Sequence, residues 1–162
     1  MHMVIRAIVY GKDEDEALEE AKTIFQRFVE NRVFDYYTLF NDEDATVSGI
    51  ARWGRLPVCP LAKSKKGKED ISQAMKSTKD CFLRHLNRVR ASLHTYSDDE
   101  LLNEGKNGWF KYTCRCMGQF VGPNVFLYDS DGEGILNEKH LKYALTKRPF
   151  KKVYVVPADV HY

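Results

Sequence analysis

The sequence predicts one domain of the α+β class, and three observations lead to this prediction. The chain has 162 residues, of which 43% are hydrophobic, so it is long enough and apolar enough to bury a core. Short β-prone runs alternate with segments of helical period. No internal repeat or low-complexity tract marks a second domain, so we treat residues 1–162 as one unit, in which Met1-His2 is compatible with a cloning remnant ahead of Met3.

Residues 4–10 form the first β-prone run, and Gly11 ends it. Asp13 and Glu16 have the spacing of a capping box, which marks the start of a helix. The apolar residues that follow recur at helical spacing and form one predicted buried stripe, which consists of Ala17, Leu18, Ala21, Ile24, Phe25, Phe28 and Val29.

Two more β-prone runs follow, at 33–40 and 45–53, and the polar residues between them predict a turn. The resulting β-α-β-β order matches the first half of a ferredoxin-like sandwich. The stretch from Gly54 to Gly67, which contains prolines and lysines, predicts an exposed loop. We therefore expect an α+β ferredoxin-like βαββαβ sandwich with a helical insertion over residues 54–108.

Residues 69–93 carry the strongest helix pattern in the chain. The predicted buried stripe of this helix consists of Ile71, Met75, Thr78, Phe82, Leu86, Val89 and Leu93. His85 widens the stripe, and a histidine on an apolar face is more often a hydrogen-bonded core residue than a ligand. Ser97 and Glu100 form a second capping-box pattern, for a short helix that we expect Gly105 to end.

The remainder of the chain is predicted to contain three strands and one helix. We expect strands at 109–117, 124–128 and 153–156 and a helix at 137–146. Pro157 is expected to end the last strand, because proline has no N–H to donate to a sheet.

The net charge of +2 is too small to indicate a polyanion-binding surface over the whole protein, but residues 63–90 contain nine basic and only three acidic side chains. Lysines near a helix start bind anions, and lysines and arginines on one face bind nucleic-acid phosphates. We predict an anion-binding surface for nucleic acid or a nucleotide, formed by Lys63, Lys65, Lys66, Lys68, Lys76, Arg84 and Arg88. The alternative is that this charged run is a solvated face.

The densest group of oxygen ligands lies at residues 129–138. Asp129, Asp131 and Glu133 are interspersed with glycines, and this arrangement resembles an EF-hand calcium loop over about a dozen residues. The resemblance breaks at the twelfth position, where His140 replaces the bidentate glutamate. The residues before the loop also predict a strand where an EF-hand has a helix.

A second interpretation of the acidic loop uses the predicted strand-helix-strand order around it. If the strands at 124–128 and 153–156 run parallel, their carboxyl ends share one sheet edge. The side chains gathered there would be Asp129, Asp131, Glu133, Asp159 and His161. Such a group could hold Mg²⁺ or Mn²⁺ and support metal-dependent hydrolysis of a phosphate ester, whereas the EF-hand resemblance would imply Ca²⁺. The simpler alternative is a solvated acidic turn at the start of a helix.

The four cysteines lack the spacing of a secreted disulfide framework, and the chain has neither a signal-peptide pattern nor an apolar stretch of about 20 residues. We therefore expect a cytoplasmic protein with no membrane partner. Cys114 and Cys116 would share one face of the predicted strand and, with Cys59 or Cys81 and a histidine, could bind zinc. The leading functional prediction is a binding module for nucleic acid or a nucleotide. The alternatives are the phosphate-ester hydrolase and a protein-interaction or inhibitor protein.

Overall fold

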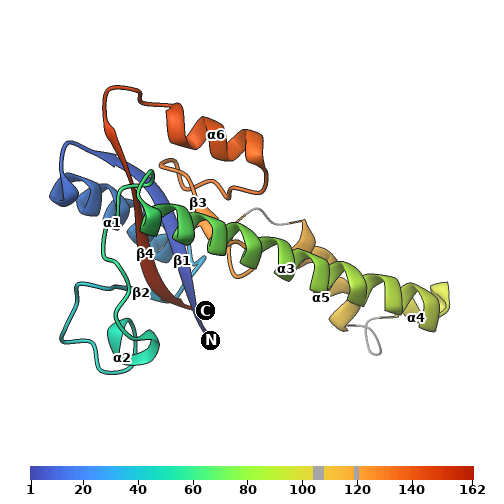
Figure 1. Ribbon diagram of the computed structural model, residues 1–162. Helices are drawn as coiled ribbons and strands as arrows, with labels where there is room; N and C mark the ends of the chain where they lie inside the picture. The colour runs from blue at the N-terminus through green and yellow to red at the C-terminus, as the bar shows by residue number, and fades with distance from the viewer. Residues whose placement is uncertain (104–107, 119–120) are drawn as a thin grey trace.

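A computed structural model describes residues 1–103, 108–118 and 121–162 of the chain (Figure 1). The described residues form β1 (His2–Gly11), α1 (Glu14–Glu30), β2 (Tyr36–Leu39), α2 (Ile50–Trp53), α3 (Lys65–Thr95), α4 (Asp98–Leu102), α5 (Gly108–Met117), β3 (Leu127–Tyr128), α6 (Glu138–Thr146) and β4 (Lys152–His161). These strands make one mixed sheet in the order β2-β4-β1-β3. The prediction of a single α+β domain is confirmed. The last strand, however, lies between β1 and β2, and this order differs from that of a ferredoxin-like sandwich.

Both faces of the sheet are covered by helices. Because side chains alternate along a strand, Ile5 and Val9 of β1 lie in the core under α1, whereas Ile8 lies in the core under α3 and α6. Strands β1 and β4 pair along their whole length, from His2 opposite His161 to Gly11 opposite Lys152. This central pair is buried on both faces, which explains why the first β-prone run is almost continuously apolar.

Helix α1 forms as predicted. The Asp13 carboxylate accepts a hydrogen bond from the Glu16 backbone N–H at 2.9 Å and so caps the first turn. Five residues of the predicted stripe are buried, namely Ala17, Ala21, Ile24, Phe25 and Phe28. The acidic residues of the first turn lie at the positive end of the helix dipole, which is sufficient to explain them.

Helix α3 begins at Lys65, earlier than predicted, because Ser64 caps it. The Ser64 hydroxyl accepts the Gly67 backbone N–H at 3.1 Å. Glycine inside a helix costs about 1 kcal/mol relative to alanine, but a Cβ on Gly67 would lie only 2.1 Å from the Leu61 carbonyl oxygen. Gly67 therefore lets the first turn of α3 lie directly on the backbone of the preceding segment.

The distal half of α3 extends past the sheet and, with α4 and α5, forms an arm (Figure 1). The buried residues of α3 end at His85. The prediction that Phe82 and Leu93 are buried is wrong, since 45% and 58% of their surfaces are exposed. The predicted capping box of Ser97 is confirmed at the start of α4, whereas Gly105 lies outside the described residues.

Residues 109–117 were predicted as a strand and instead belong to helix α5. Thr113 and Cys116 are three residues apart and are the buried residues of this helix. The Thr113 hydroxyl donates to the Trp109 carbonyl oxygen at 2.6 Å, across one helical turn. Packing against α3 therefore overrides the β-propensity of the aromatic and β-branched residues in this segment.

Two further predictions about strands are wrong, one for residues 45–53 and one for the end of β4. Residues 45–53 do not return as a strand, because the chain is irregular up to α2. Strand β4 does not end at Pro157 but continues to His161.

The position of Pro157 within the sheet explains why a proline is tolerated there. It lies opposite Arg6 of β1, whose N–H points away from β4 and donates to Phe126. The Arg6–Pro157 pair is therefore one that exchanges no hydrogen bonds. On its other side, β4 pairs with β2 through residues 158–161 and with residues 60–62 through residues 153–155. Pro157 lies in the gap between these two partners, where no N–H is required.

The predicted parallel arrangement of the strands on either side of α6 is also wrong. Strand β3 runs parallel to β1, whereas β4 runs antiparallel to it. The carboxyl end of β3 therefore lies beside the carboxyl end of β1, whereas the carboxyl end of β4 lies beside the amino end of β1, at the opposite end of the strands. Helix α6 itself is confirmed, with Asn137 as its N-cap. Within the part of the chain that the structure describes, no helix has the length and apolar character to cross a membrane.

Candidate functional site

The long helix α3 divides the basic segment between two hollows in the surface. Lys63 and Lys68, at the start of the helix, line a groove beside α6. Arg84 and Arg88, farther along the helix, line a hollow beside α5. The predicted anion-binding residues therefore do not form one continuous surface.

The other three predicted anion-binding residues lie outside both hollows. The ammonium groups of Lys65 and Lys66 are 4.0 and 3.7 Å from carboxylate oxygens of Glu69. Lys76 is exposed on α3 and lines neither hollow. All three lysines therefore lie on the exposed surface of α3, away from both hollows.

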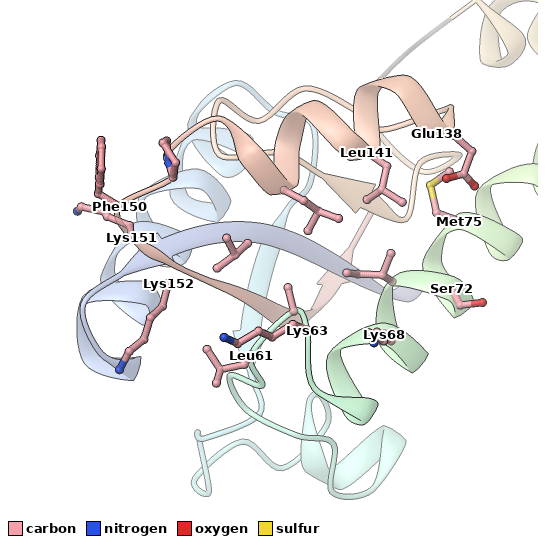
Figure 2. Close-up of a pocket in the computed structure, with 15 residues that line it drawn as sticks. Leu61, Lys63, Lys68, Ser72, Met75, Glu138, Leu141, Phe150, Lys151 and Lys152 are labelled. Carbon is pink, nitrogen blue, oxygen red and sulfur yellow. The ribbon is translucent and has the colours of Figure 1, made fainter.

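We call the first hollow the lysine groove. It has a volume of about 770 Å³ and lies between the first half of α3 and α6 (Figure 2). Its apolar lining consists of Leu61, Ala62, Ile71, Met75, Leu141, Leu145, Pro149, Phe150 and Val153. The core beneath it contains small side chains, Ala62, Ala74 and Ala144, where the two helices converge on the sheet.

Charge is unevenly distributed along the lysine groove. Figure 2 shows Lys63, Lys151 and Lys152 toward one end and Glu138 at the other. Lys151 forms an ion pair with a carboxylate of α1. Among the described residues, Lys63, Lys68 and Lys152 have no carboxylate within 4.0 Å. Lys63 and Lys152 therefore leave positive charge toward one end of the groove, whereas Figure 2 shows Lys68 on α3, nearer to Ser72.

We call the second hollow the arginine–aromatic hollow. It has a volume of about 710 Å³ and lies where α3 leaves the sheet, between the amino end of β1 and α5. Five aromatic side chains line it, namely Trp53, Trp109, Tyr112, Phe126 and Tyr162. Trp109 keeps 75% of its surface exposed. Arg84 and Arg88 have no carboxylate within 4.0 Å in the described ranges.

Buried polar groups lie beneath the arginine–aromatic hollow. Arg6 Nε donates to Asp70 Oδ1 at 3.0 Å, and both residues are buried. His85 Nε2 lies 2.9 Å from Asn124 Oδ1, which confirms the prediction of a hydrogen-bonded core histidine. His85 Nδ1 and Asp70 Oδ2 are buried and have no partner among the described residues. Such atoms are rare in folded proteins, so the floor of this hollow keeps unused hydrogen-bonding capacity.

A smaller hollow of about 390 Å³ continues along the arm between α3 and α5. It shares Arg88 and Trp109 with the arginine–aromatic hollow. The two hollows therefore adjoin at Arg88 and at the exposed indole ring of Trp109, and we call the pair of hollows the track.

Asp129 organises the acidic loop after β3. Its Oδ1 accepts the backbone N–H groups of Asp131 and Glu133, each at 2.9 Å. Its Oδ2 lies 2.9 Å from His140 Nε2 on α6. Because the Asp129 side chain is only 5% exposed, its oxygens are directed into the protein. This carboxylate therefore ties the turn to α6, which gives it a structural role.

The other two acids of the loop point toward solvent. Asp131 forms an ion pair with Lys147, and this hydrogen bond lowers the pKa of Asp131 below its ordinary value. The Asp131 side chain is 54% exposed, so the pair is screened by water. Glu133 is exposed.

Asp159 and His161 lie near the carboxyl end of β4, at the opposite end of the strands from the acidic loop. Asp159 is fully buried, accepts the Gly49 backbone N–H at 2.8 Å and lies 3.1 Å from His2 Nδ1. His161 Nδ1 lies 2.7 Å from an oxygen of Asp35. The five residues predicted as metal ligands are thus separated into two groups. In the described ranges, no three histidine, cysteine or acidic side chains are arranged to hold a metal ion.

The cysteines do not share one face as predicted. Because successive residues of a helix are rotated by about 100°, Cys114 and Cys116 lie on nearly opposite faces of α5. Of these two cysteines, only Cys114 is exposed. Burial raises the pKa of the Cys59 thiol to about 12 and also raises that of Cys81. Because the thiolate is the reactive form, burial lowers the reactivity of both thiols.

The sequence interpretation missed the aromatic lining of the hollow and the lysines at 151 and 152. Trp109 and Tyr112 were assigned to a strand, although their spacing of three residues places them on one face of a helix. This spacing, together with the same spacing of Thr113 and Cys116, was the signal available in the sequence. Nothing in the sequence indicated that residues 151–152 return beside the start of α3.

The chain was compared with known proteins and protein families. No curated protein and no solved structure matches it significantly. One family model matches residues 1–162, the segment that contains both hollows, and its description is "Domain of unknown function (DUF7995)". This match over the full length shows that the chain belongs to the DUF7995 family.

Proposed function

We propose that this protein is a binding module for single-stranded nucleic acid, which it holds in the arginine–aromatic hollow and along the arm. The observation that carries the proposal is the position of Trp109. Its indole ring is largely exposed, it is shared by two adjoining hollows, and Arg88 lines the same two hollows.

The aromatic residues suit the bases of a single strand. Stacking of a base on an aromatic side chain contributes about 1–3 kcal/mol and tolerates every base, because each base has a π-face. Trp109 and Tyr112 come from α5, while Trp53 and Tyr162 line the same hollow from other parts of the fold. Rings from several elements offer more than one stacking surface.

The arginines suit the phosphates. Arg84 and Arg88 follow each other on one face of α3 and have no carboxylate partner among the described residues. Guanidinium groups bind phosphate oxygens through two parallel hydrogen bonds. Since the track spans two hollows, a short oligonucleotide is expected to bind more tightly than a mononucleotide, which would fill only the larger one.

The test is fluorescence anisotropy with labelled oligo(dT) of about 12 nucleotides, within the range of known single-strand sites. We expect Arg84→Glu with Arg88→Glu to abolish binding, and Arg84→Ala with Arg88→Ala to weaken binding and to lower its salt slope by about 1.4 relative to the wild type, at 0.7 per phosphate contact. Trp109→Ala is expected to raise the Kd about 5- to 150-fold, whereas Trp109→Phe retains part of the stacking.

The matched control reverses two charges on the same helix outside the hollow, with Lys76→Glu and Lys79→Glu. This variant is expected to bind nearly as well as the wild type. If the control loses as much affinity as the arginine variant, binding is a general effect of charge and the proposal is wrong. Absence of binding at about 50 mM salt also excludes it.

A protein partner is the second candidate, and exposed leucines on the arm favour it. Leu93 and Leu102 expose 58% and 76% of their surfaces, and aromatic and arginine residues are enriched at protein interfaces. In this case oligo(dT) does not bind, and Leu93→Asp prevents co-purification of a defined partner from the host while Lys79→Asp does not.

A further inference from the structure

We propose that the lysine groove binds a small amphipathic anion, an unbranched aliphatic chain that ends in one carboxylate. This site shares no lining residue with the arginine–aromatic hollow. The inference therefore does not depend on the proposed nucleic-acid binding.

The shape and lining of the groove indicate an apolar ligand body. A volume of about 770 Å³ lies within the range of roughly 300–1,000 Å³ found for small-molecule sites. Leucine, isoleucine, methionine and valine side chains from α3, α6 and β4 line it. Several of these side chains, among them Met75, Leu141 and Leu145, are only partly buried, so a bound aliphatic chain would remove more of their apolar surface from water.

The charge distribution fixes the orientation of the ligand. An anionic head belongs at the end with Lys63 and Lys152, and the tail then runs toward Met75 (Figure 2). Glu138 at the far end would repel a second negative group. Since Lys151 is already paired with Glu16, the charged end matches one carboxylate better than an acidic peptide with several.

Phe150 adds a further observation at the lysine end. Its side chain is completely exposed, with a relative accessibility of 100%, yet it lines the groove beside Lys151 and Lys152. An apolar ring of this size without contacts gains buried surface if an aliphatic chain lies against it. Phe150 is therefore expected to contact the ligand near its head group.

Isothermal titration calorimetry with octanoate, decanoate and dodecanoate, each below its micelle-forming concentration, tests the proposal. Each buried methylene is expected to tighten binding by up to about fourfold, with a stoichiometry of one. Dodecyltrimethylammonium has the same tail with a cationic head and is expected to bind at least tenfold more weakly. Equal affinity for the two head groups, or no dependence on chain length, would overturn the proposal.

Two variants place the binding in the groove. Lys63→Glu with Lys152→Glu is expected to weaken dodecanoate binding at least tenfold, whereas Lys139→Glu with Lys142→Glu, on exposed positions of α6, leaves it unchanged. Ser72→Trp introduces an indole from an exposed lining position and is expected to abolish the dependence on chain length, with circular dichroism confirming the fold. If dodecanoate binds all three variants equally, or if only an acidic peptide binds the wild type, the assignment is wrong.

Discussion

Replacing Asp129 distinguishes a structural acidic loop from a cation site. The carboxylate accepts two backbone N–H groups and lies beside His140 Nε2, with all three distances at 2.9 Å. Hydrogen bonds to a charged group contribute about 1.5–3 kcal/mol each. The three share one carboxylate, and an opened loop can bind water, so their sum is an upper limit. We expect Asp129→Ala to lower the free energy of unfolding by about 3–4 kcal/mol.

Two companion variants make this prediction specific. Asp129→Asn keeps an oxygen that can accept the two N–H groups but loses the charge opposite His140, so we expect a loss of about 1–2 kcal/mol. Asp131→Ala removes a neighbouring carboxylate whose side chain is 54% exposed, and we expect a loss below about 1 kcal/mol. The order of stability should therefore be wild type, Asp131→Ala, Asp129→Asn and Asp129→Ala.

Urea denaturation and thermal melting measure these differences. For a chain of this size, 1 kcal/mol corresponds to about 2–4 °C in Tm, so Asp129→Ala should melt roughly 6–16 °C below the wild type. If Asp129→Ala lowers the free energy of unfolding by no more than Asp131→Ala does, the structural role of Asp129 is refuted. A melting temperature that rises with Mg²⁺ or Ca²⁺ in the wild type, but not in Asp129→Ala, would restore the interpretation as a metal site.

Three further predictions concern other parts of the fold. Gly67→Ala is expected to destabilise the protein by about 2 kcal/mol or more in urea titrations, because its Cβ would lie 2.1 Å from the Leu61 carbonyl oxygen; a stabilised variant would show that helix propensity outweighs this contact. Iodoacetamide should modify Cys114 in the native protein and leave Cys59 unmodified, as peptide mass spectrometry would show, since Cys114 is exposed and burial raises the pKa of Cys59 to about 12. The pKa of Asp131 is lowered by its lysine partner, so the stability it contributes is present above the ordinary value near 3.8 and is lost as the pH falls through the lowered pKa. The difference in stability between wild type and Asp131→Asn should therefore shrink below about pH 4, and a difference that grows on acidification would contradict this sign.

Local patterns predicted the elements whose packing follows a simple period. Helix α1 was predictable because its buried residues recur every three or four positions behind Asp13, and the same holds for the first half of α3. The capping box of Ser97 depends only on neighbouring residues and was also predictable.

The failures depend on partners that are distant in sequence. The aromatic segment 109–117 looks like a strand until α3 is placed beside it, and Pro157 looks like a strand end until the neighbours of β4 are known. The same limit applies to the candidate sites. The basic residues were visible, but their division between two hollows depends on where α3 leaves the sheet, and Lys152 joins Lys63 only because β4 returns beside residues 60–62.

The pairing of β1 with β4 has a consequence for how the protein folds. Residues near position 2 must find residues near position 161 before the centre of the sheet exists, so the central contact closes a loop of almost the entire chain. Long-range closure of this kind slows folding, because its entropy is lost before the contacts form. The helices can form early from local contacts, whereas the sheet, and with it the floor of both hollows, is expected to assemble late and in one cooperative step. A nascent chain that lacks the segment from Lys152 onward would therefore expose the apolar faces of α1 and α3 until β4 is added.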